Sequence, residues 1–445
     1  MNSAATTAPV VIVGAGWSGL ACALELALAG RPSLVLDAAP QAGGRGRTLA
    51  VDLGGREVLL DNGQHLLVGA CTEILRLARA AGLDPAALFL RRPFEVRYAD
   101  GWRIQAARLP APLHLGWGLV RAAGWSAGER LALARWSARQ ALGRWSAPAG
   151  STVAESLLPL PQGLVRRLWR PLCLSVMNAE PGQACARLFF NVLRDTLGGS
   201  ERASHLLLAR RPLSSVLPEA AAAALLRLGS QIRLRSPVLS LESPAAGAWT
   251  ARLRDQSIAA RALVLALPPQ NAAALLAGRD GPLEAIAAQL RAIGTAPIST
   301  VYLRYAPGTR LPHPFLALPD HAAHGRHGQW VFDRGASDSR LDGVFSVVVS
   351  GEGEHAHMER SALCAAVSRQ LSAELGLPAA IACEAIIEKR ATLAPVPGLS
   401  RPGTRLAPGL FLAGDAADSP YPSTLEGSVR AGVAAARAVL EERPG

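Results

Sequence analysis

A glycine-rich turn near the N-terminus constrains the fold of this chain more than any other feature. Residues 10–19 read VVIVGAGWSG, where four apolar β-formers lead into Gly14, Gly16 and Gly19, and the following residues have helical composition. A strand, a tight turn and a helix in this order predict a dinucleotide-binding unit. The glycines permit the turn, the approach of a pyrophosphate and the close packing of helix on strand. The helix N-terminus supplies N–H groups to the phosphates.

The residues after this helix add further features of a dinucleotide site. A second apolar segment, Ser33–Leu36, ends in Asp37, whose carboxylate can accept hydrogen bonds from ribose hydroxyls. In the following GGRGRT loop, adjacent glycines including Gly44 bring the backbone close to a ligand, and Arg45 and Arg47 offer cations to a pyrophosphate. An exposed basic loop is common by itself, but its place behind the acid-tipped strand favours a bound ligand.

The other end of the chain carries a second strand that ends in a glycine and an acid. Residues 410–415 read LFLAGD, and a helix rich in small residues begins near Thr424. Gly414 and Asp415 therefore lie at the carboxyl edge of a strand, where α/β sheets bind ligands. The N-terminal motif alone fits NAD as well as FAD. Because a flavin ring that extends from the pyrophosphate needs a second anchoring edge, the two motifs together predict FAD.

The length of 445 residues is too great for one simple core, so we expect two interleaved domains. The predicted fold class is α/β, a Rossmann-type FAD-binding domain interleaved with an α+β substrate domain. We assign residues 1–80, 205–270 and 390–445 to the first domain, and 81–204 and 271–389 to the second, which contains a helical insertion. Apolar patterning predicts strands at 231–241, 249–253, 262–267, 300–305, 329–333 and 344–350, and a helix at 358–375.

Composition excludes several function classes. The formal net charge is +12, yet no DNA- or RNA-binding signature accompanies it, so we expect no nucleic acid partner. Six scattered cysteines without a CxxC pair indicate a reduced compartment and neither a disulfide framework nor a metal site. The first apolar run is already the Rossmann strand, which predicts a cytoplasmic protein without a signal peptide. No apolar stretch is long enough to span a bilayer.

Tryptophan and arginine alternate in a segment that we expect to be mainly helical, from Leu83 to Arg211. Its clearest helix is Ala127–Leu142, where Ser126 and Glu129 form a capping pair. Two interpretations stay open: amphipathic helices at a membrane interface, or ordinary helices that cover a core. Five of the nine tryptophans fall here: Trp102, Trp117, Trp125, Trp136 and Trp145.

A polar cluster interrupts an apolar run at residues 59–67, LLDNGQHLL. Buried polar groups need partners, so such a cluster is unusual inside a core and is placed well to face a cofactor ring. The other interpretation is a strand followed by an Asn-Gly turn, with His65 as a structural histidine.

The sequence resembles the superfamily of FAD-dependent amine oxidases and phytoene desaturases, and within it the squalene-associated branch, the hydroxysqualene dehydroxylases. The general features are VVIVGAGWSGLACALELALAG, the GGRGRT loop and the LFLAGD strand with its helix. The narrower branch is indicated by DNGQH, QWVFDR, EKRAT and the PSTLEG form of the C-terminal helix start.

This resemblance implies an amine-oxidase-like two-domain fold and bound FAD. Many relatives have Glu where this chain has Asp37, which is one methylene shorter. No cysteine lies in the C-terminal motif, so the flavin is expected to be non-covalent. The residues implied to contact FAD are Gly14, Gly16, Gly19, Asp37, Gly44, Arg45, Val238 through its backbone, Gly414, Asp415 and Leu425.

The reaction implied is the reductive removal of the allylic hydroxyl of hydroxysqualene, which gives squalene in bacterial squalene and hopanoid biosynthesis. This chemistry requires a dry apolar tunnel and a proton donor near the oxygen. The candidates for the donor are His65, Gln64, Tyr421 and a water held by Lys389, the only lysine in the chain. None of the four is assigned the role from the sequence.

Two other hypotheses stay open. One is an enzyme of opposite redox direction, a polyprenoid desaturase or an amine oxidase. The other is a non-catalytic dinucleotide-binding scaffold. The partners expected are an apolar isoprenoid substrate and a flavin-reducing protein. A further hypothesis is peripheral association with the inner face of the cytoplasmic membrane through basic surface groups.

Overall fold

The computed structural model describes residues 8–245, 247–278, 281–321 and 324–442. Its first domain contains a six-stranded sheet in the order β10-β2-β1-β14-β21-β20, in which the first five strands pair in parallel and β20 pairs antiparallel. The strands in this order are Gln231–Arg233, Ser33–Leu36, Val10–Val13, Ala262–Leu265, Leu410–Leu412 and Arg405–Ala407.

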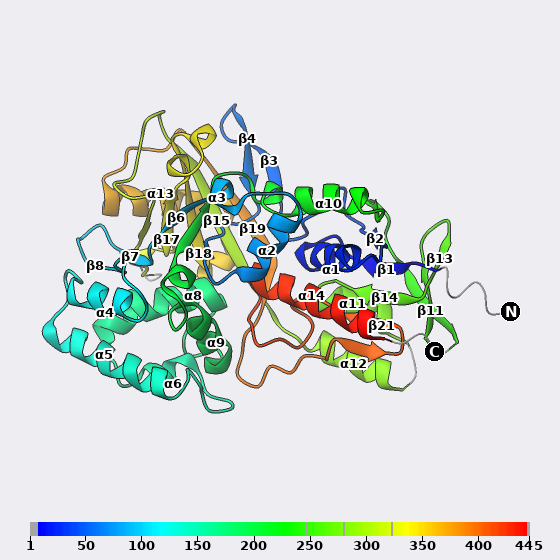
Figure 1. Ribbon diagram of the computed structural model, residues 1–445. Helices are drawn as coiled ribbons and strands as arrows, with labels where there is room; N and C mark the ends of the chain where they lie inside the picture. The colour runs from blue at the N-terminus through cyan, green and yellow to red at the C-terminus, as the bar shows by residue number, and fades with distance from the viewer. Residues whose placement is uncertain (1–7, 246, 279–280, 322–323, 443–445) are drawn as a thin grey trace.

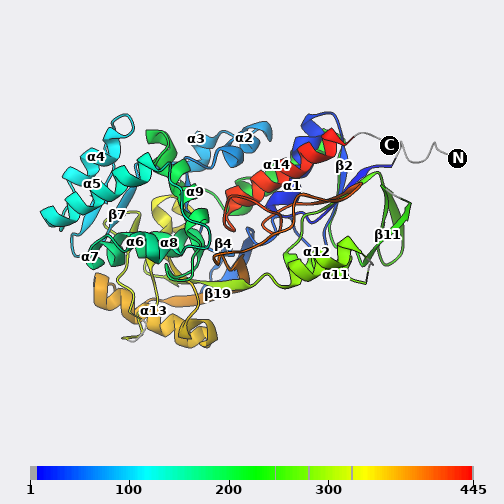
Figure 2. The same ribbon diagram turned by 90° about the horizontal axis from the view of Figure 1, so that it is seen from below.

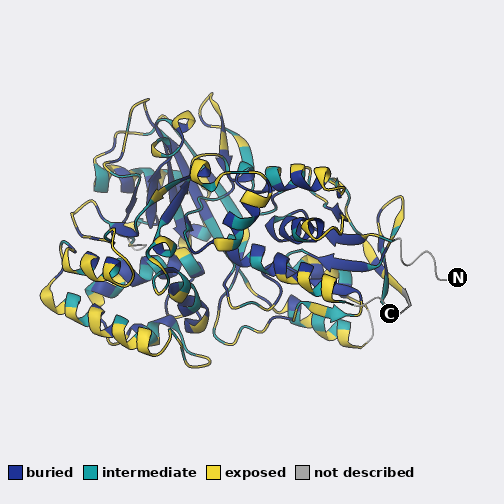
Figure 3. Cartoon of the chain, viewed as in Figure 1, coloured by how far each residue is buried: buried dark blue, intermediate teal, exposed yellow. Residues whose placement is uncertain are grey.

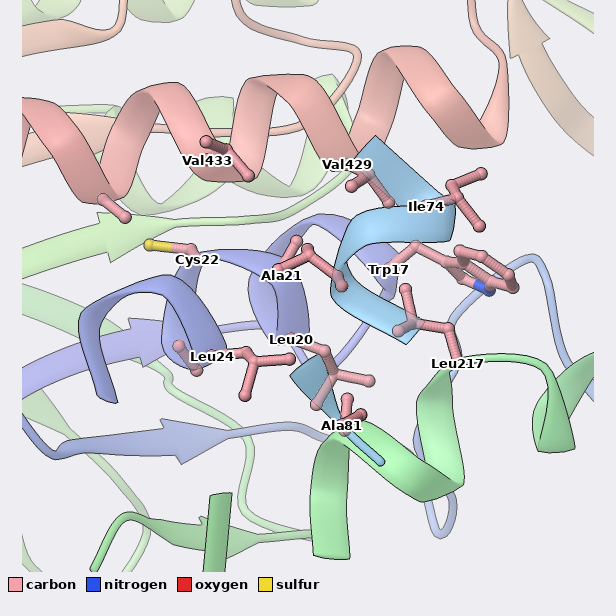
Figure 4. Packing of buried hydrophobic residues seen from close by; sticks show 14 of the residues in the cluster. Trp17, Leu20, Ala21, Cys22, Leu24, Ile74, Ala81, Leu217, Val429 and Val433 are labelled. Carbon is pink, nitrogen blue, oxygen red and sulfur yellow. The ribbon is translucent and has the colours of Figure 1, made fainter. Parts of the chain in front are cut away.

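Helices cover both faces of this sheet, which is why its central strands are buried throughout. On one face, Val10 and Ile12 pack with α1 (Trp17–Leu28), α2 (Thr72–Ala80), α10 (Pro218–Arg227) and α14 (Leu425–Glu441). Figure 4 shows Ala21 and Cys22 of α1 in one cluster with Val429 and Val433 of α14.

The opposite face of the sheet packs against shorter elements. Val11 and Val13 join a cluster with α11 (Pro269–Leu276) and α12 (Pro282–Arg291). The small antiparallel sheet that borders this face consists of β11 (Ser240–Ala245), β12 (Ala248–Arg252) and β13 (Ser257–Ala260).

The second domain lies beside the first (Figure 1) and contains a five-stranded antiparallel sheet in the order β16-β17-β18-β15-β19. The helix α13 (Arg360–Leu375) packs on one face through Leu363 and Val367. The strands in this order are Phe315–Ala317, Trp330–Asp333, Val344–Ser350, Thr295–Arg304 and Ala382–Leu393.

A group of helices packs on the other side of that sheet, as seen from below in Figure 2. The capping box of Ser126 and Glu129 is present as predicted. The helices are α4 (Leu113–Val120), α5 (Ala127–Leu142), α6 (Val153–Leu157), α7 (Gln162–Leu164), a π-helical turn (Val165–Trp169), α8 (Arg170–Met177) and α9 (Ala186–Thr196).

Short strands and one further short helix complete the chain. The pair β3 and β4 forms a hairpin, and β7 pairs with β8. The strand β9 pairs with β5 on one side and with β6 on the other. The elements are β3 (Thr48–Asp52), β4 (Glu57–Asp61), β5 (Leu67–Val68), α3 (Pro85–Leu88), β6 (Phe89–Arg92), β7 (Glu95–Arg97), β8 (Arg103–Gln105) and β9 (Leu206–Ala209).

One sequence prediction needs correction. The segment 231–241 is not one strand: it leaves the sheet after Arg233, because Arg235 adopts a φ of 52° and Pro237 has no N–H for a ladder. The segment from Leu83 to Arg211 is mainly helical, as predicted, and has short strands near both ends. Its tryptophans are mainly core: Trp102, Trp125 and Trp136 are buried.

The contact between α1 and α14 predicts a stability effect. A Cβ on Gly432 would lie 2.1 Å from the Ser18 carbonyl oxygen, so the two helices would have to separate. Gly432→Ala should lower the free energy of unfolding by ~1–3 kcal/mol. Thermal unfolding followed by circular dichroism measures the effect. The control is Gly116→Ala in the exposed α4, where no heavy atom lies within 4 Å of the new Cβ, and it should be neutral or stabilising.

Candidate functional site

The carboxyl ends of three parallel strands bring both ends of the chain together. Leu265 of β14 pairs with Val13 of β1 on one side and with Leu412 of β21 on the other. The glycines that follow therefore lie at one edge of the sheet. Gly14 has a φ of 113°, and a Cβ there would lie 2.3 Å from the Ala266 carbonyl oxygen. Only glycine allows this turn.

A cavity of about 950 Å³ opens at this edge and continues into the second domain. It is lined by nine of the ten residues that the sequence assigned to FAD: Gly14, Gly16, Asp37, Gly44, Arg45, Val238, Gly414, Asp415 and Leu425.

Gly19 is the exception, because it is not among the residues that line the cavity. A Cβ on Gly19 would lie 1.8 Å from the Gly14 carbonyl oxygen. Because glycine has no Cβ, α1 can begin directly against the turn. Gly19 thus has the packing role that the motif predicts, and it does not line the cavity.

Asp37 is bound to the glycine turn itself. One carboxylate oxygen accepts a hydrogen bond from the Ala15 amide at 2.5 Å, and the other accepts one from the Ala39 amide at 2.7 Å. Each oxygen keeps a further lone pair, and the side chain lines the cavity, so a ribose hydroxyl can still donate to it. The shorter side chain therefore serves both the turn and the expected ligand.

Arg45 joins the two halves of the site. Its Nη2 lies 2.7 Å from a carboxylate oxygen of Asp415, and its Nη1 donates to the Ala391 carbonyl at 2.9 Å. Asp415 is buried and Arg45 is partly exposed to the cavity. The guanidinium was expected to face a pyrophosphate. In the structure its charge also neutralises the carboxylate at the C-terminal strand.

The polar turn after β4 lines the same cavity. Asn62 donates to a Glu388 carboxylate oxygen at 3.1 Å, and Gln64 and His65 follow it along the wall. Burial is the main cause that lowers the pKa of His65, and the nearby Asp61 carboxylate opposes it. The interpretation of this segment as a strand followed by a bend at Asn62 and Gly63 is confirmed, and the segment lines the cavity; that it faces a cofactor ring stays a prediction.

The other two proton-donor candidates are Tyr421 and Lys389, and they differ in their position relative to the cavity. Tyr421 lines the cavity, but its hydroxyl is hydrogen bonded to Asp195 and accepts a hydrogen bond from Arg430 at 2.7 Å. Burial and the hydrogen bond to Asp195 raise its pKa, so this hydroxyl is a poor acid. Lys389 is exposed and is not among the residues that line the cavity. The structure therefore removes Lys389 from the candidates.

The part of the cavity in the second domain is mainly apolar, although Glu95, Ser175 and Ser350 also line the cavity. It lies between the helices of the second domain and the sheet on which they pack. Its walls are Leu172 and Val176 of α8, Phe315 of β16, Trp330 and Phe332 of β17, and Val348 of β18.

The sequence profile described as flavin-containing amine oxidoreductase matches residues 17–440. The chain belongs to this family. It is an FAD-dependent oxidoreductase, which confirms the predicted cofactor, and its architecture is the predicted two-domain fold. The non-covalent attachment and the individual FAD contacts stay predictions.

Two similar proteins are both named hydroxysqualene dehydroxylase, one from Sinorhizobium fredii and one from Rhodopseudomonas palustris. They are 31% and 32% identical to this chain, and each alignment covers 97% of this chain and 98% of the relative. Among solved structures, cyclohexylamine oxidase from Brevibacterium oxydans superposes with a TM-score of 0.71 at 21% identity, over 98% of this chain and 99% of that one. The latter likeness shows the fold alone.

The residues present fit FAD. The glycine turn leaves no room for a Cβ, Asp37 offers acceptors beside it, and the N-termini of α1 and α14 face the same cavity through Trp17 and Leu425. When bound, FAD supplies two-electron hydride chemistry.

Sequence reasoning missed several polar residues at this site. Glu388 and Thr392 belong to the EKRAT motif and line the cavity. Arg334 belongs to QWVFDR and is hydrogen bonded to Gln64. In the sequence analysis both motifs served only to identify the branch. Their polar residues were nevertheless a signal from which a position near the cavity could have been predicted. Among the described residues, no group of three or more His, Cys, Asp or Glu could hold a metal ion.

Removal of the Asp37 carboxylate should weaken FAD binding. Asp37→Ala deletes the acceptor of the turn amides and of the ribose, and hydrogen bonds to a charged group are worth ~1.5–3 kcal/mol. We expect the dissociation constant of FAD to rise by ~10–100-fold, measured by quenching of flavin fluorescence on titration of the apoprotein. Asp255→Ala, in an exposed turn, is the control. Equal affinities of the two variants would contradict the assignment.

Proposed function

We propose that this chain is a hydroxysqualene dehydroxylase, which removes the allylic hydroxyl of hydroxysqualene and yields squalene and water. The observation that carries the proposal is the similarity to two proteins of that name over almost the full length of each chain. The reaction consumes a hydride and a proton. The carbon–oxygen bond breaks, hydride forms the new carbon–hydrogen bond, and the proton leaves with the oxygen as water.

The cavity supports a hydrocarbon substrate. The part that faces the second domain is lined by aliphatic and aromatic side chains and can hold an isoprenoid chain away from water. Polar groups gather where the turn 62–65 meets the FAD-binding edge. In this arrangement, a polar function of an otherwise apolar molecule would lie beside the flavin region.

The chain's own residues give this reaction its environment. Apolar walls exclude water and lower the local dielectric, which strengthens each hydrogen bond near the leaving oxygen. The ion pair of Arg45 and the buried Asp415 joins the two halves of the site. The residues of the polar turn would supply hydrogen-bonding groups to a substrate in the cavity.

An amine oxidase is less well supported. Such an enzyme is expected to surround the amine with an aromatic cage beside the flavin. Of the four tyrosines, only Tyr421 lines the cavity, and its hydroxyl is already occupied by Asp195 and Arg430. Tyr302 is buried in the sheet, where it donates to the Asp61 carbonyl.

The activity is tested by anaerobic incubation of the photoreduced protein with hydroxysqualene. We expect reoxidation of the flavin, followed by its absorbance, together with squalene in equal amount in the extract. A desaturase or an amine oxidase would instead reduce the oxidised flavin when a more saturated hydrocarbon or an amine is added. That result, with no squalene formed, would refute the proposal. A flavin-reducing protein partner remains part of the proposal for turnover.

We also propose that helices α4 and α5 dock on an anionic membrane surface, which would give peripheral localisation and access to an apolar substrate. Large apolar side chains are exposed on α4, where Leu113 is 62%, Trp117 48% and Val120 63% exposed. Figure 3 shows exposed residues along the outer side of both helices. Arg135 and Arg139 of α5 are exposed nearby. Apolar groups beside arginines match the interface of an anionic bilayer.

None of the described helices is long and apolar enough to cross a membrane, so the contact would be peripheral. We expect the protein to pellet with phosphatidylglycerol liposomes and less so at high salt. Val120→Glu should reduce the pelleted fraction several-fold. The control is Leu226→Glu, which changes a side chain 62% exposed on α10. Equal pelleting of both variants, or no pelleting of the wild type at low salt, would refute this docking.

A further inference from the structure

The turn 62–66 is held by hydrogen bonds from several distant elements, and Gln64 is their centre. Its Oε1 accepts hydrogen bonds from Ser346 Oγ of β18 at 2.8 Å and from the Arg334 guanidinium. Its Nε2 donates to the His65 carbonyl at 3.1 Å, and its backbone N–H donates to Thr300 Oγ1 of β15 at 3.3 Å. Both lone pairs of Oε1 are therefore used, and the side chain cannot turn toward a ligand.

Arg334 fixes this arrangement from the 3-10 turn that directly follows β17. It is only 6% exposed, and its second Nη lies 3.5 Å from a carboxylate oxygen of Asp61. Asp61 in turn accepts hydrogen bonds from Thr48 Oγ1 at 2.9 Å and from the Leu213 amide at 2.7 Å. Buried ionised groups are tolerated only when they are paired and hydrogen bonded. The ion pair therefore links Asp61, at the end of the strand before the turn, to Arg334, which holds Gln64.

His65 differs from its neighbours because one of its ring nitrogens remains available. Its Nδ1 lies 2.7 Å from the Gly63 carbonyl oxygen. A carbonyl oxygen only accepts, so Nδ1 carries the proton and the neutral ring has its lone pair on Nε2. Within the described part of the chain no hydrogen bond to Nε2 is found, and the side chain lines the cavity. The structure thus leaves His65 Nε2 available as an acceptor on a turn that hydrogen bonds hold in place.

We propose that His65 Nε2 accepts a hydrogen bond from the hydroxyl of the substrate alcohol. Arg334, acting through Gln64, is the positioning residue that holds His65 for this contact. The inference rests on the proposed function and adds to it a residue that distinguishes substrate from product. Squalene has no hydroxyl and cannot donate to Nε2. The site therefore binds the alcohol more tightly than the hydrocarbon that forms from it, and product release is favoured.

The contact is tested by ligand binding to the oxidised holoenzyme, which does not turn over. Dissociation constants for hydroxysqualene and for squalene are read from the perturbation of flavin absorbance. We expect the wild type to prefer the alcohol by ~3–10-fold, as one hydrogen bond provides. His65→Phe should abolish this preference and leave the squalene constant and the flavin content unchanged. His357→Phe, at an exposed position, is the control and should keep the preference.

The positioning role is tested with Arg334→Met and with the double variant that also carries His65→Phe. If Arg334 acts through the turn, each single variant loses the same preference and the double variant loses no more. Arg334→Lys, which keeps a charge beside Asp61, should restore part of it. Because removal of a buried charge can prevent folding, Ser346→Ala serves as a second variant. It deletes one hydrogen bond to Gln64 and should reduce the preference ~2–3-fold.

The outcomes separate this inference from the proposed function. If the wild type converts hydroxysqualene but His65→Phe retains the preference for the alcohol, only the role of His65 is refuted. If His65→Phe instead loses flavin, the ring faces the cofactor and the inference is likewise refuted. Additive losses in the double variant refute the role of Arg334 alone. A wild type that neither converts nor prefers the alcohol refutes both the inference and the proposed function.

Discussion

The pairing of β14 with β1 on one side and β21 on the other is the constraint on which the site depends. It brings the turn at Gly14 and the turn at Gly414 to one edge of the sheet, although they lie at opposite ends of the chain. Parallel strands require long connections, and the second domain is inserted in those connections. The ion pair between Arg45 and Asp415 then joins the same two chain ends beyond the sheet, at 2.7 Å. Sheet and ion pair together define where a cofactor can lie.

The sequence predicted this half of the molecule well because its signals are local. A glycine that must adopt positive φ, a buried strand and a capped helix are each encoded within a few residues, so β2 and β18 have the predicted limits and α5 has the predicted cap. Gly19 was assigned to the ligand because the motif was interpreted as a unit. In the structure it packs against the Gly14 carbonyl, which is the close packing of helix on strand that the motif itself predicts.

The substrate half could not be predicted in the same way because its interactions are tertiary. Asp61 and Arg334 are far apart in the sequence, and nothing local indicates that they form a buried ion pair. The rarity of Lys389 suggested a role, but rarity is a property of composition, and the side chain is exposed. Tyr421 reaches the cavity, yet its hydroxyl is used by Asp195 and Arg430. Which polar groups remain free depends on neighbours that only the fold supplies.

The change in cavity character occurs within a few residues of one turn. Asn62 Nδ2 and Gln64 Oε1 are hydrogen bonded to the protein, His65 keeps Nε2 as an acceptor, and Leu66 and Leu67 begin the apolar wall. A flexible turn would let these side chains exchange places, and the polar group of a ligand would then have no fixed position. Because Arg334, Ser346 and Thr300 hold the turn from three strands or their ends, the boundary between polar and apolar surface is fixed relative to the sheet. The buried charges of Arg334 and Asp61 stabilise the fold little by themselves. Their effect is to make a single geometry of the turn more favourable than the alternatives, and the proposed action on one carbon of a long hydrocarbon would require such a fixed geometry.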